Sequence, residues 1–253
     1  MQYLFSEKVK RLNAAQPLVH CITNQVTTSL VANSLLALGA SPIMSSHPDE
    51  VEAISGLADA LYLNIGTLQP ATLSSMLKAG MVASRCGIPI VLDPVGAGLT
   101  ETRSKACLHL LNELNMSAVR GNASEIMALA DLQAMPHGVD ACHQVEEACV
   151  AADVLAKRHG LVVALTGVSD YASNGDENCC ITGGHSLMAK VSGMGCVVGA
   201  LLAAWLTLPG DRLTATAELL QIVAQCGLEA GRQSHGPGSF VTAWLDQLYQ
   251  YGK

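Results

Sequence analysis

The stretch most informative about the fold is Lys190-Val191-Ser192-Gly193-Met194-Gly195-Cys196, which an apolar run over 197–205 follows directly. A Gly-x-Gly turn that opens a buried helix can hold an anion, because glycines let backbone N–H groups approach a ligand closely. The helix directs its unsatisfied N–H groups and its positive dipole end at the same point. The dipole also favours the thiolate form of Cys196. Taken alone, the turn is equally typical of close packing between a helix and a strand.

Composition limits the class of protein. The chain has 253 residues, of which 50% are hydrophobic and only 14% are charged. This length and balance predict one α/β domain over 1–253. So few charges cover a monomer surface poorly, which favours buried contacts between subunits. The net charge of −7 argues against nucleic acid as a partner, but it does not exclude ATP, which local groups bind.

Cysteine usage and apolar runs indicate the compartment. The nine cysteines are dispersed without a CxxC pair, which fits a reducing cytosol and not a disulfide framework or a zinc site. The N-terminal residues lack the features of a signal peptide. The longest apolar stretch, 197–208, is too short to span a bilayer. We expect a cytoplasmic protein with no membrane partner.

Short β-prone runs alternate with longer helix-prone runs along the chain. The alternation predicts a mostly parallel sheet with helices on both faces and ligands beyond the carboxyl ends of its strands. A loop over 133–142 is predicted to be mobile. Strands are expected at 18–22, 61–65, 89–93, 117–120 and 161–165, with a hairpin over 171–181, and helices at 27–38, 71–84, 101–113, 123–130, 145–159, 196–206, 212–232 and 239–249.

Polar side chains follow the predicted strands. Asp93 opens Asp93-Pro94-Val95-Gly96-Ala97-Gly98, where a carboxylate faces a ligand or its metal, or else caps the next turn. Arg120-Gly121-Asn122-Ala123-Ser124-Glu125 fits a helix capping box between Asn122 and Glu125. A functional interpretation places Arg120 on a phosphate and puts Asn122 with Glu125 near Mg²⁺, Glu125 acting through water. Thr166-Gly167 suits a phosphate contact or an ordinary turn.

The chain has neither a Walker A motif nor an early GxGxxG. The order Asp93-Pro94-Val95-Gly96, Asn122-Ala123-Ser124-Glu125, Thr166-Gly167 and the late glycine turn resembles the ribokinase-like superfamily of small-molecule kinases. Within it, the chain resembles the hydroxyethylthiazole kinase family over nearly its full length. The resemblance extends over Pro17-Leu18-Val19-His20-Cys21-Ile22-Thr23-Asn24 and 33–44. Cys196 distinguishes this family from the rest of the superfamily, because the other members mostly have Asp at this position.

The resemblance implies a three-layer ribokinase-like fold and ATP-dependent phosphorylation of the primary alcohol of 4-methyl-5-(2-hydroxyethyl)thiazole in thiamine biosynthesis or salvage. It also implies a homotrimer with sites between subunits, so that Asn24 and Val26 face the substrate from a neighbouring chain. Met194 stands where the family usually has Thr or Ala, and the sequence does not determine how its longer side chain affects the local shape of the turn. The remaining implied roles are thiazole binding by Met44 and Gly193, ATP binding by Arg120 and Thr166, and the Mg²⁺–phosphate region for Asp93 and Glu125.

These residues suggest a mechanism. The N–H groups of Gly193, Met194, Gly195 and Cys196 are expected to receive charge that develops on the γ-phosphoryl group. Cys196 orients the alcohol and accepts its proton, with a modest contribution because a thiol is a mediocre base for an alcohol. Three alternatives stay open: another vitamin-precursor kinase such as a hydroxymethylpyrimidine kinase, a nucleotide-binding sensor without activity, and a thiol redox enzyme.

Overall fold

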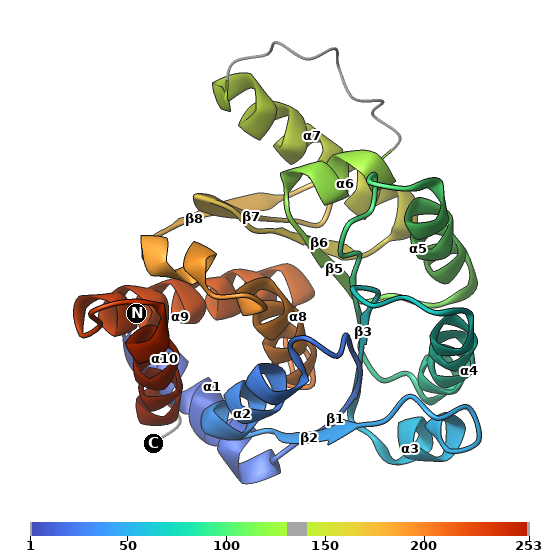
Figure 1. Ribbon diagram of the computed structural model, residues 1–253, viewed down its shortest axis with the longest axis horizontal. Helices are drawn as coiled ribbons and strands as arrows, with labels where there is room; N and C mark the ends of the chain where they lie inside the picture. Colours follow the sequence, from blue (N-terminus) through green and yellow to red (C-terminus); the bar gives the residue numbers. More distant parts are fainter. Residues whose placement is uncertain (1, 131–140, 252–253) are drawn as a thin grey trace.

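The computed structural model describes residues 2–130 and 141–251. Its centre is one eight-stranded sheet in the order β2-β1-β3-β4-β5-β6-β7-β8 (Figure 1). The strands from β2 to β6 run parallel, and β7 and β8 form an antiparallel hairpin at one edge. The strands are β1 (Leu18–Ile22), β2 (Ser41–Met44), β3 (Ala60–Asn64), β4 (Ile90–Asp93), β5 (Ala118–Gly121), β6 (Val162–Leu165), β7 (Ser169–Ser173) and β8 (Asn178–Thr182).

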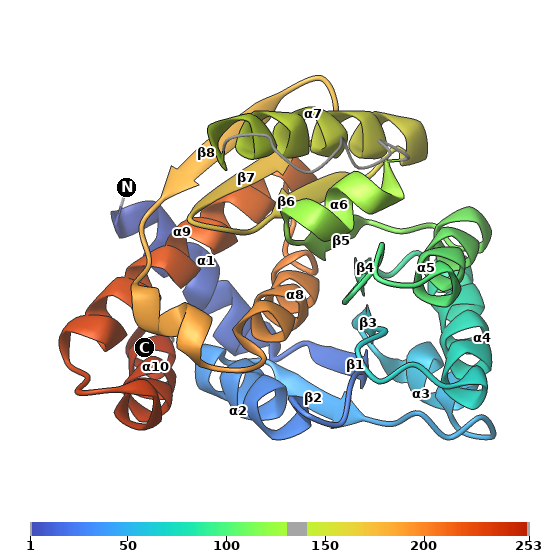
Figure 2. The same cartoon turned by 45° about the horizontal axis from the view of Figure 1, so that its top comes forward.

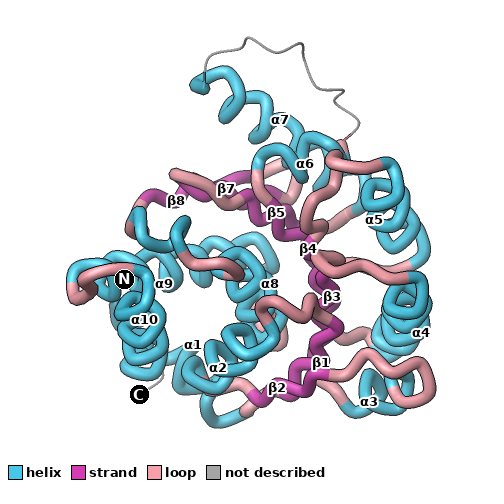
Figure 3. Tube along the Cα trace, in the orientation of Figure 1, coloured by secondary structure: helices cyan, strands magenta, loops and turns pink. Residues whose placement is uncertain are grey.

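Helices cover both faces of the sheet, which gives three layers (Figures 1 and 3). The first group is α1 (Gln2–Ala15), α2 (Thr28–Leu38), α8 (Met194–Trp205), α9 (Arg212–Arg232) and α10 (Pro237–Tyr251). The second group is α3 (Val51–Leu57), α4 (Pro70–Cys86), α5 (Glu101–Glu113), α6 (Ala123–Leu129) and α7 (Ala141–His159). A short 3₁₀ turn, η1 (Ser186–Lys190), leads into α8.

Alternate residues of the strands enter two separate cores. In β4, Val91 packs with the α8 side, whereas Leu92 packs with the α4 side. The α8 side is lined by small strand residues such as Ala118 and Ala164, and α8 itself is almost entirely buried. Close packing holds this helix beside the central strands, as the tilted view shows (Figure 2). Its first turn lies near the end of β5, where Gly195 approaches Arg120.

The sequence-based expectations agree with this architecture. The mostly parallel sheet, the helices on both faces and the hairpin are confirmed. Three elements were absent from the prediction: α1, β2 and α3. The strand β2 has only four residues, includes Pro42 and lies at the sheet edge, and α3 has seven residues, so neither carries a long periodic signal. Of the predicted loop, 133–140 lies outside the described residues and 141–142 belongs to α7.

The helix lengths bear on membrane association. Within 2–130 and 141–251, no helix combines the length and the apolar character that a bilayer crossing requires. The apolar helix α8 has 12 residues and lies against the sheet, which accounts for its composition.

Candidate active site

The glycine turn lies where α8 begins. Gly193 is the N-cap residue with φ of 94°, a left-handed conformation that favours glycine. A Cβ on Gly193 would lie 2.4 Å from Thr27 Cγ2, so the turn is closed against the start of α2. The side chain of Met194 is buried and packs with the core. The unusual methionine is therefore accommodated without opening the turn.

The guanidinium of Arg120 lies directly over this turn. A Cβ on Gly195 would approach Arg120 Nη1 to 2.3 Å, so a larger residue at this position would displace the guanidinium. Arg120 Nη2 donates a hydrogen bond to Thr166 Oγ1, and Nη1 lies 3.6 Å from Asp93 Oδ1. The structure thus brings together the two predicted nucleotide residues, the predicted metal-region carboxylate and the anion-binding turn.

Asp93 is fully buried at the end of β4. Its Oδ2 accepts hydrogen bonds from Tyr62 OH at 2.8 Å and Asn64 Nδ2 at 3.0 Å. Its Oδ1 has no hydrogen-bond partner. Burial raises the pKa of Asp93 to about 6, against the lowering effect of the Arg120 charge. The structure therefore holds one carboxylate oxygen in place and leaves the other for a ligand.

Cys196 lies in the first turn of α8 and is 8% exposed. Its Sγ accepts a hydrogen bond from Asn24 Nδ2 at 3.3 Å. Burial and the negative charge of Asp93 raise the pKa of the Cys196 thiol above 9.0, although neighbouring hydrogen bonds lower it. The expectation that the helix dipole favours a thiolate is wrong here, because burial and the nearby carboxylate outweigh it.

Glu125 and Asn122 form the predicted capping box of α6. Asn122 Oδ1 accepts from Glu125 N, and Glu125 Oε2 accepts from Asn122 N, both at 2.9 Å. Glu125 Oε1 also accepts from Gly96 N at 2.9 Å. This last bond ties α6 to the loop after β4, so Glu125 places its charge beside Asp93, whose pKa it raises.

Two residues of this cluster were missed by the sequence analysis, Asn64 and Tyr62. Asn64 ends β3 and is paired in register with Asp93. A polar residue at the end of a buried strand was the signal that selected Asp93, and the same criterion would have selected Asn64. Tyr62 lies within an apolar strand and carried no such signal.

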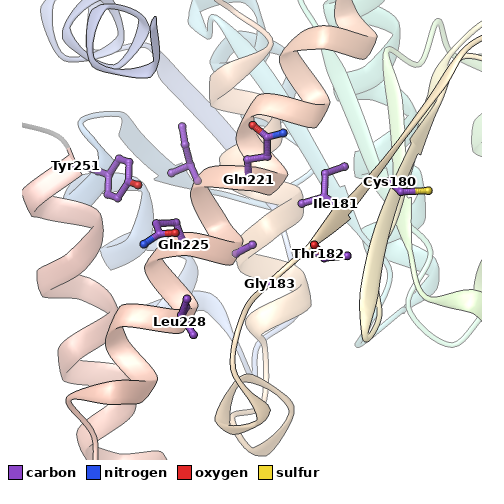
Figure 4. Close-up of a pocket in the computed structure, with 10 residues that line it drawn as sticks. Cys180, Ile181, Thr182, Gly183, Gln221, Gln225, Leu228 and Tyr251 are labelled. Atoms are coloured by element: carbon purple, nitrogen blue, oxygen red, sulfur yellow. The ribbon is translucent and has the colours of Figure 1, made fainter. Parts of the chain in front are cut away.

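A cavity of about 760 Å³ opens beside the cluster. It runs from Arg120, Thr166 and Gly195 past Asp170 to Lys190. A second pocket of about 560 Å³ lies between β8, α9 and α10 (Figure 4). The second pocket shares Ile181, Gly183 and Ala224 with the cavity but includes none of the predicted site residues. The larger cavity is therefore the one that adjoins the anion-binding turn.

The sequence profile of the hydroxyethylthiazole kinase family matches residues 9–253. The chain belongs to this family. It is 48% identical to a hydroxyethylthiazole kinase of Serratia proteamaculans, over 92% of this chain and 88% of the relative. Family membership makes the protein a kinase, and ATP is its co-substrate.

Solved structures agree with this family assignment. A hydroxyethylthiazole kinase from Pyrococcus horikoshii has a TM-score of 0.89 at 38% identity, covering 98% of this chain and 93% of the other. A ribokinase-like superfamily protein from Enterococcus faecalis has a TM-score of 0.69 at 11% identity, covering 97% and 94%. The second likeness concerns the fold alone and confirms the predicted ribokinase-like architecture.

Two residues that the resemblance assigns to the substrate are not among the residues that line the larger cavity. Met44 ends β2, half-buried against the core on the α8 side. Val26 is 72% exposed and lies two residues after Asn24. Asn24 Nδ2 donates to Sγ of Cys196 in the same chain, at the start of α8.

Proposed function

We propose that the protein transfers the γ-phosphoryl group of ATP to the primary alcohol of 4-methyl-5-(2-hydroxyethyl)thiazole. The observation that carries this proposal is the meeting of the Gly193–Cys196 turn, the Arg120 guanidinium and the Asp93 carboxylate at one point. Phosphoryl transfer depends on positioning and charge neutralisation more than on covalent chemistry, and this cluster provides both.

Each group has a distinct role in this scheme. The backbone N–H groups of Gly193, Met194, Gly195 and Cys196 stabilise the equatorial oxygens of the γ-phosphoryl group during transfer. Arg120, held by Thr166 and Asp93, adds a fixed positive charge. The alcohol oxygen forms a bond to the γ-phosphorus while the bond to the ADP oxygen breaks, and the alcohol proton passes to an oxygen of the transferred phosphoryl group and then to solvent. The cavity past Asp170 accommodates the rest of the nucleotide. We assign Asn122, which caps α6 two residues after Arg120, to the phosphate end of the nucleotide.

Cys196 orients the alcohol in this proposal. Asn24 donates to its Sγ, which leaves the S–H group to hydrogen-bond the substrate oxygen. Because its pKa is raised, the thiol stays protonated at neutral pH and contributes little as a general base. Met44, Val26 and Gly193 surround the thiazole ring in this arrangement.

The carboxylates fit Mg²⁺. The buried Asp93 Oδ1 has no hydrogen-bond partner, and an oxygen of this kind is a preferred ligand of that hard cation. Mg²⁺ is usually held by one or two carboxylates together with substrate phosphates and water, and Asp93 and Glu125 are two carboxylates close enough that the charge of Glu125 raises the pKa of Asp93. We assign the ion to Asp93 directly or through water, and to Glu125 through water. When bound, Mg²⁺ neutralises charge on the phosphate oxygens.

A coupled ADP-release assay tests the proposed reaction. With MgATP, we expect ADP release that depends on hydroxyethylthiazole, with little release without an acceptor. Hydroxymethylpyrimidine is the comparison substrate. ADP release with the pyrimidine alone would contradict the substrate, and ATP binding without any turnover would indicate a sensor. The closed turn around Met194 and the intact cluster support the kinase over the sensor.

We also infer a single kinase domain over 1–253, a cytoplasmic location and a homotrimer whose subunits share sites through Val26. The low content of charged residues and the 72% exposure of Val26 support the assembly. Sedimentation equilibrium is expected to give three times the chain mass of 26.3 kDa. Val26→Asp is expected to shift the protein toward monomer, whereas exposed Val168→Asp is not. A monomeric wild type would contradict this assembly.

A further inference from the structure

The end of β3 carries a carboxamide with all its hydrogen-bonding positions used. Asn64 Nδ2 donates to Tyr62 OH at 2.8 Å and to Asp93 Oδ2 at 3.0 Å. Asn64 Oδ1 accepts from Asn24 Nδ2 and from Gly66 N, both at 2.9 Å. With two donors and two acceptors satisfied, the 2% exposed Asn64 has one favourable orientation.

Backbone groups fix which atom faces which neighbour. Gly66 N–H can only donate, so Asn64 must direct Oδ1 toward it and Nδ2 toward Asp93. Thr27 N–H donates to Asn24 Oδ1 at 3.1 Å, so Asn24 must direct Nδ2 toward Asn64 and Cys196. Two backbone amides therefore determine the donor direction along the whole array.

The array connects the two halves of the site. At one end, Asp93 lies beside Arg120 on the phosphate side. At the other end, Asn24 holds the Sγ of Cys196 on the alcohol side. Tyr62 supports the middle, since its ring packs so closely on α8 that a Cβ on Gly199 would lie 2.7 Å from Tyr62 Cε2. The distance between the phosphate side and the alcohol side of the site thus depends on Asn64.

We propose that Asn64 is a positioning residue for phosphoryl transfer, which holds Asp93 and, through Asn24, Cys196 in one hydrogen-bonded array. The proposal rests on the proposed function, because it assigns the array a role in that reaction. In-line transfer tolerates little displacement of either reactant, so loosening the array lowers kcat more than it weakens substrate binding.

A double-mutant cycle tests the connection. Asn64→Ala is expected to lower kcat at least ~10-fold and Asn24→Ala about 5- to 10-fold, no more than loss of the Cys196 thiol itself, with smaller changes in KM. The double variant is expected to lie within ~2-fold of Asn64→Ala. Such non-additivity follows because Asn24 is already loose once Asn64 is removed. Multiplicative losses, or an Asn64→Ala variant that folds and keeps kcat, would overturn the proposal.

A milder variant guards against misfolding. Tyr62→Phe removes one hydroxyl and is expected to fold and to lower kcat by about 3–10-fold. Its matched control is Tyr171→Phe, which removes a 2.8 Å hydrogen bond from Tyr171 on β7 to Asp153 on α7. This variant should lose stability but keep kcat. Equal kcat in both variants would refute a role in positioning.

A measurement that does not depend on catalysis separates a failure of this proposal from a failure of the proposed function. Alkylation of Cys196 by iodoacetamide, followed by peptide mass spectrometry, is expected to be at least ~5-fold faster in Asn64→Ala than in wild type. The buried Cys107 and Cys226 serve as internal references and should not change. An unchanged alkylation rate at Cys196, or an equal rise in the alkylation rates of all three thiols, overturns the proposal. Wild type that lacks thiazole-dependent turnover contradicts only the proposed function.

Discussion

Gly193→Val is expected to lower kcat at least ~100-fold, the cost of misplacing anion-binding N–H donors. The backbone at Gly193 has φ of 94°, a region that a β-branched residue strongly disfavours. A Cβ there would lie 2.4 Å from Thr27 Cγ2, so the turn or the start of α2 must move. The buried helix α8 cannot follow, and the N–H groups leave their positions.

Steady-state kinetics beside a thermal unfolding curve measure this effect. Gly87→Val is the matched control, because Gly87 also has a positive φ, of 69°, but lies in open space at the end of α4. It should lose stability and keep kcat. Cys196→Ala should retain substantial turnover, within ~10-fold of wild type, because the thiol is a weak base. A Cys196→Ala variant more impaired than Gly193→Val would contradict this mechanism.

Asp93→Asn is expected to lower kcat about 100- to 1,000-fold while the protein becomes more stable at pH 7. The activity falls because Oδ1, which makes no hydrogen bond but lies 3.6 Å from Arg120 Nη1, loses its charge beside Arg120 and the phosphates. The stability rises because burial raises the pKa of Asp93 to about 6, so its charged form opposes folding. A raised pKa of this size corresponds to about 1–3 kcal/mol at neutral pH.

The sign of this effect determines its pH dependence. The unfolded carboxyl titrates near its ordinary pKa of 3.8, so the folded state binds more protons than the unfolded state between that value and about 6. The stability advantage of Asp93→Asn should be complete above pH 6 and should vanish below about pH 4. Urea unfolding at pH 7.5 and pH 4 measures the difference.

A second aspartate supplies the control for Asp93→Asn. Asp153 accepts hydrogen bonds from Tyr171 OH and Ser173 Oγ, away from the turn. Asp153→Asn should lose stability and keep kcat. An Asp93→Asn variant that retains wild-type kcat, or that unfolds more easily than wild type at pH 7.5, would show that the assigned burial and role are wrong.

Much of the fold was predictable because its signals are local. The apolar strand residues and the caps of the helices predicted the central strands, and the capping box of α6 formed as expected from Asn122 and Glu125. The helix α9 has the predicted bounds, Arg212–Arg232. The short edge strand β2 escaped prediction, because four half-buried residues carry no clear periodicity.

The site was predictable only in part. Residues at strand ends, such as Asp93 and Arg120, were found because parallel strands bring their carboxyl ends together. The protonation of Cys196 was not predictable from the sequence. It depends on burial and on the charge of Asp93 on β4, and no local sequence pattern contains either. The central place of Asn64 was also not predictable, since its partners come from the loop after β1, from β3 and the turn after it, and from β4.

Phosphorus NMR of a complete reaction tests the central claim most directly. The sample contains enzyme, MgATP and hydroxyethylthiazole, with a second sample that lacks the alcohol. We expect the γ-phosphate signal of ATP to be replaced, in equal amount, by a phosphate monoester that forms only when the alcohol is present. Loss of γ-phosphate to inorganic phosphate alone, or no change in either sample, would contradict the assignment of this site to phosphoryl transfer to the thiazole alcohol.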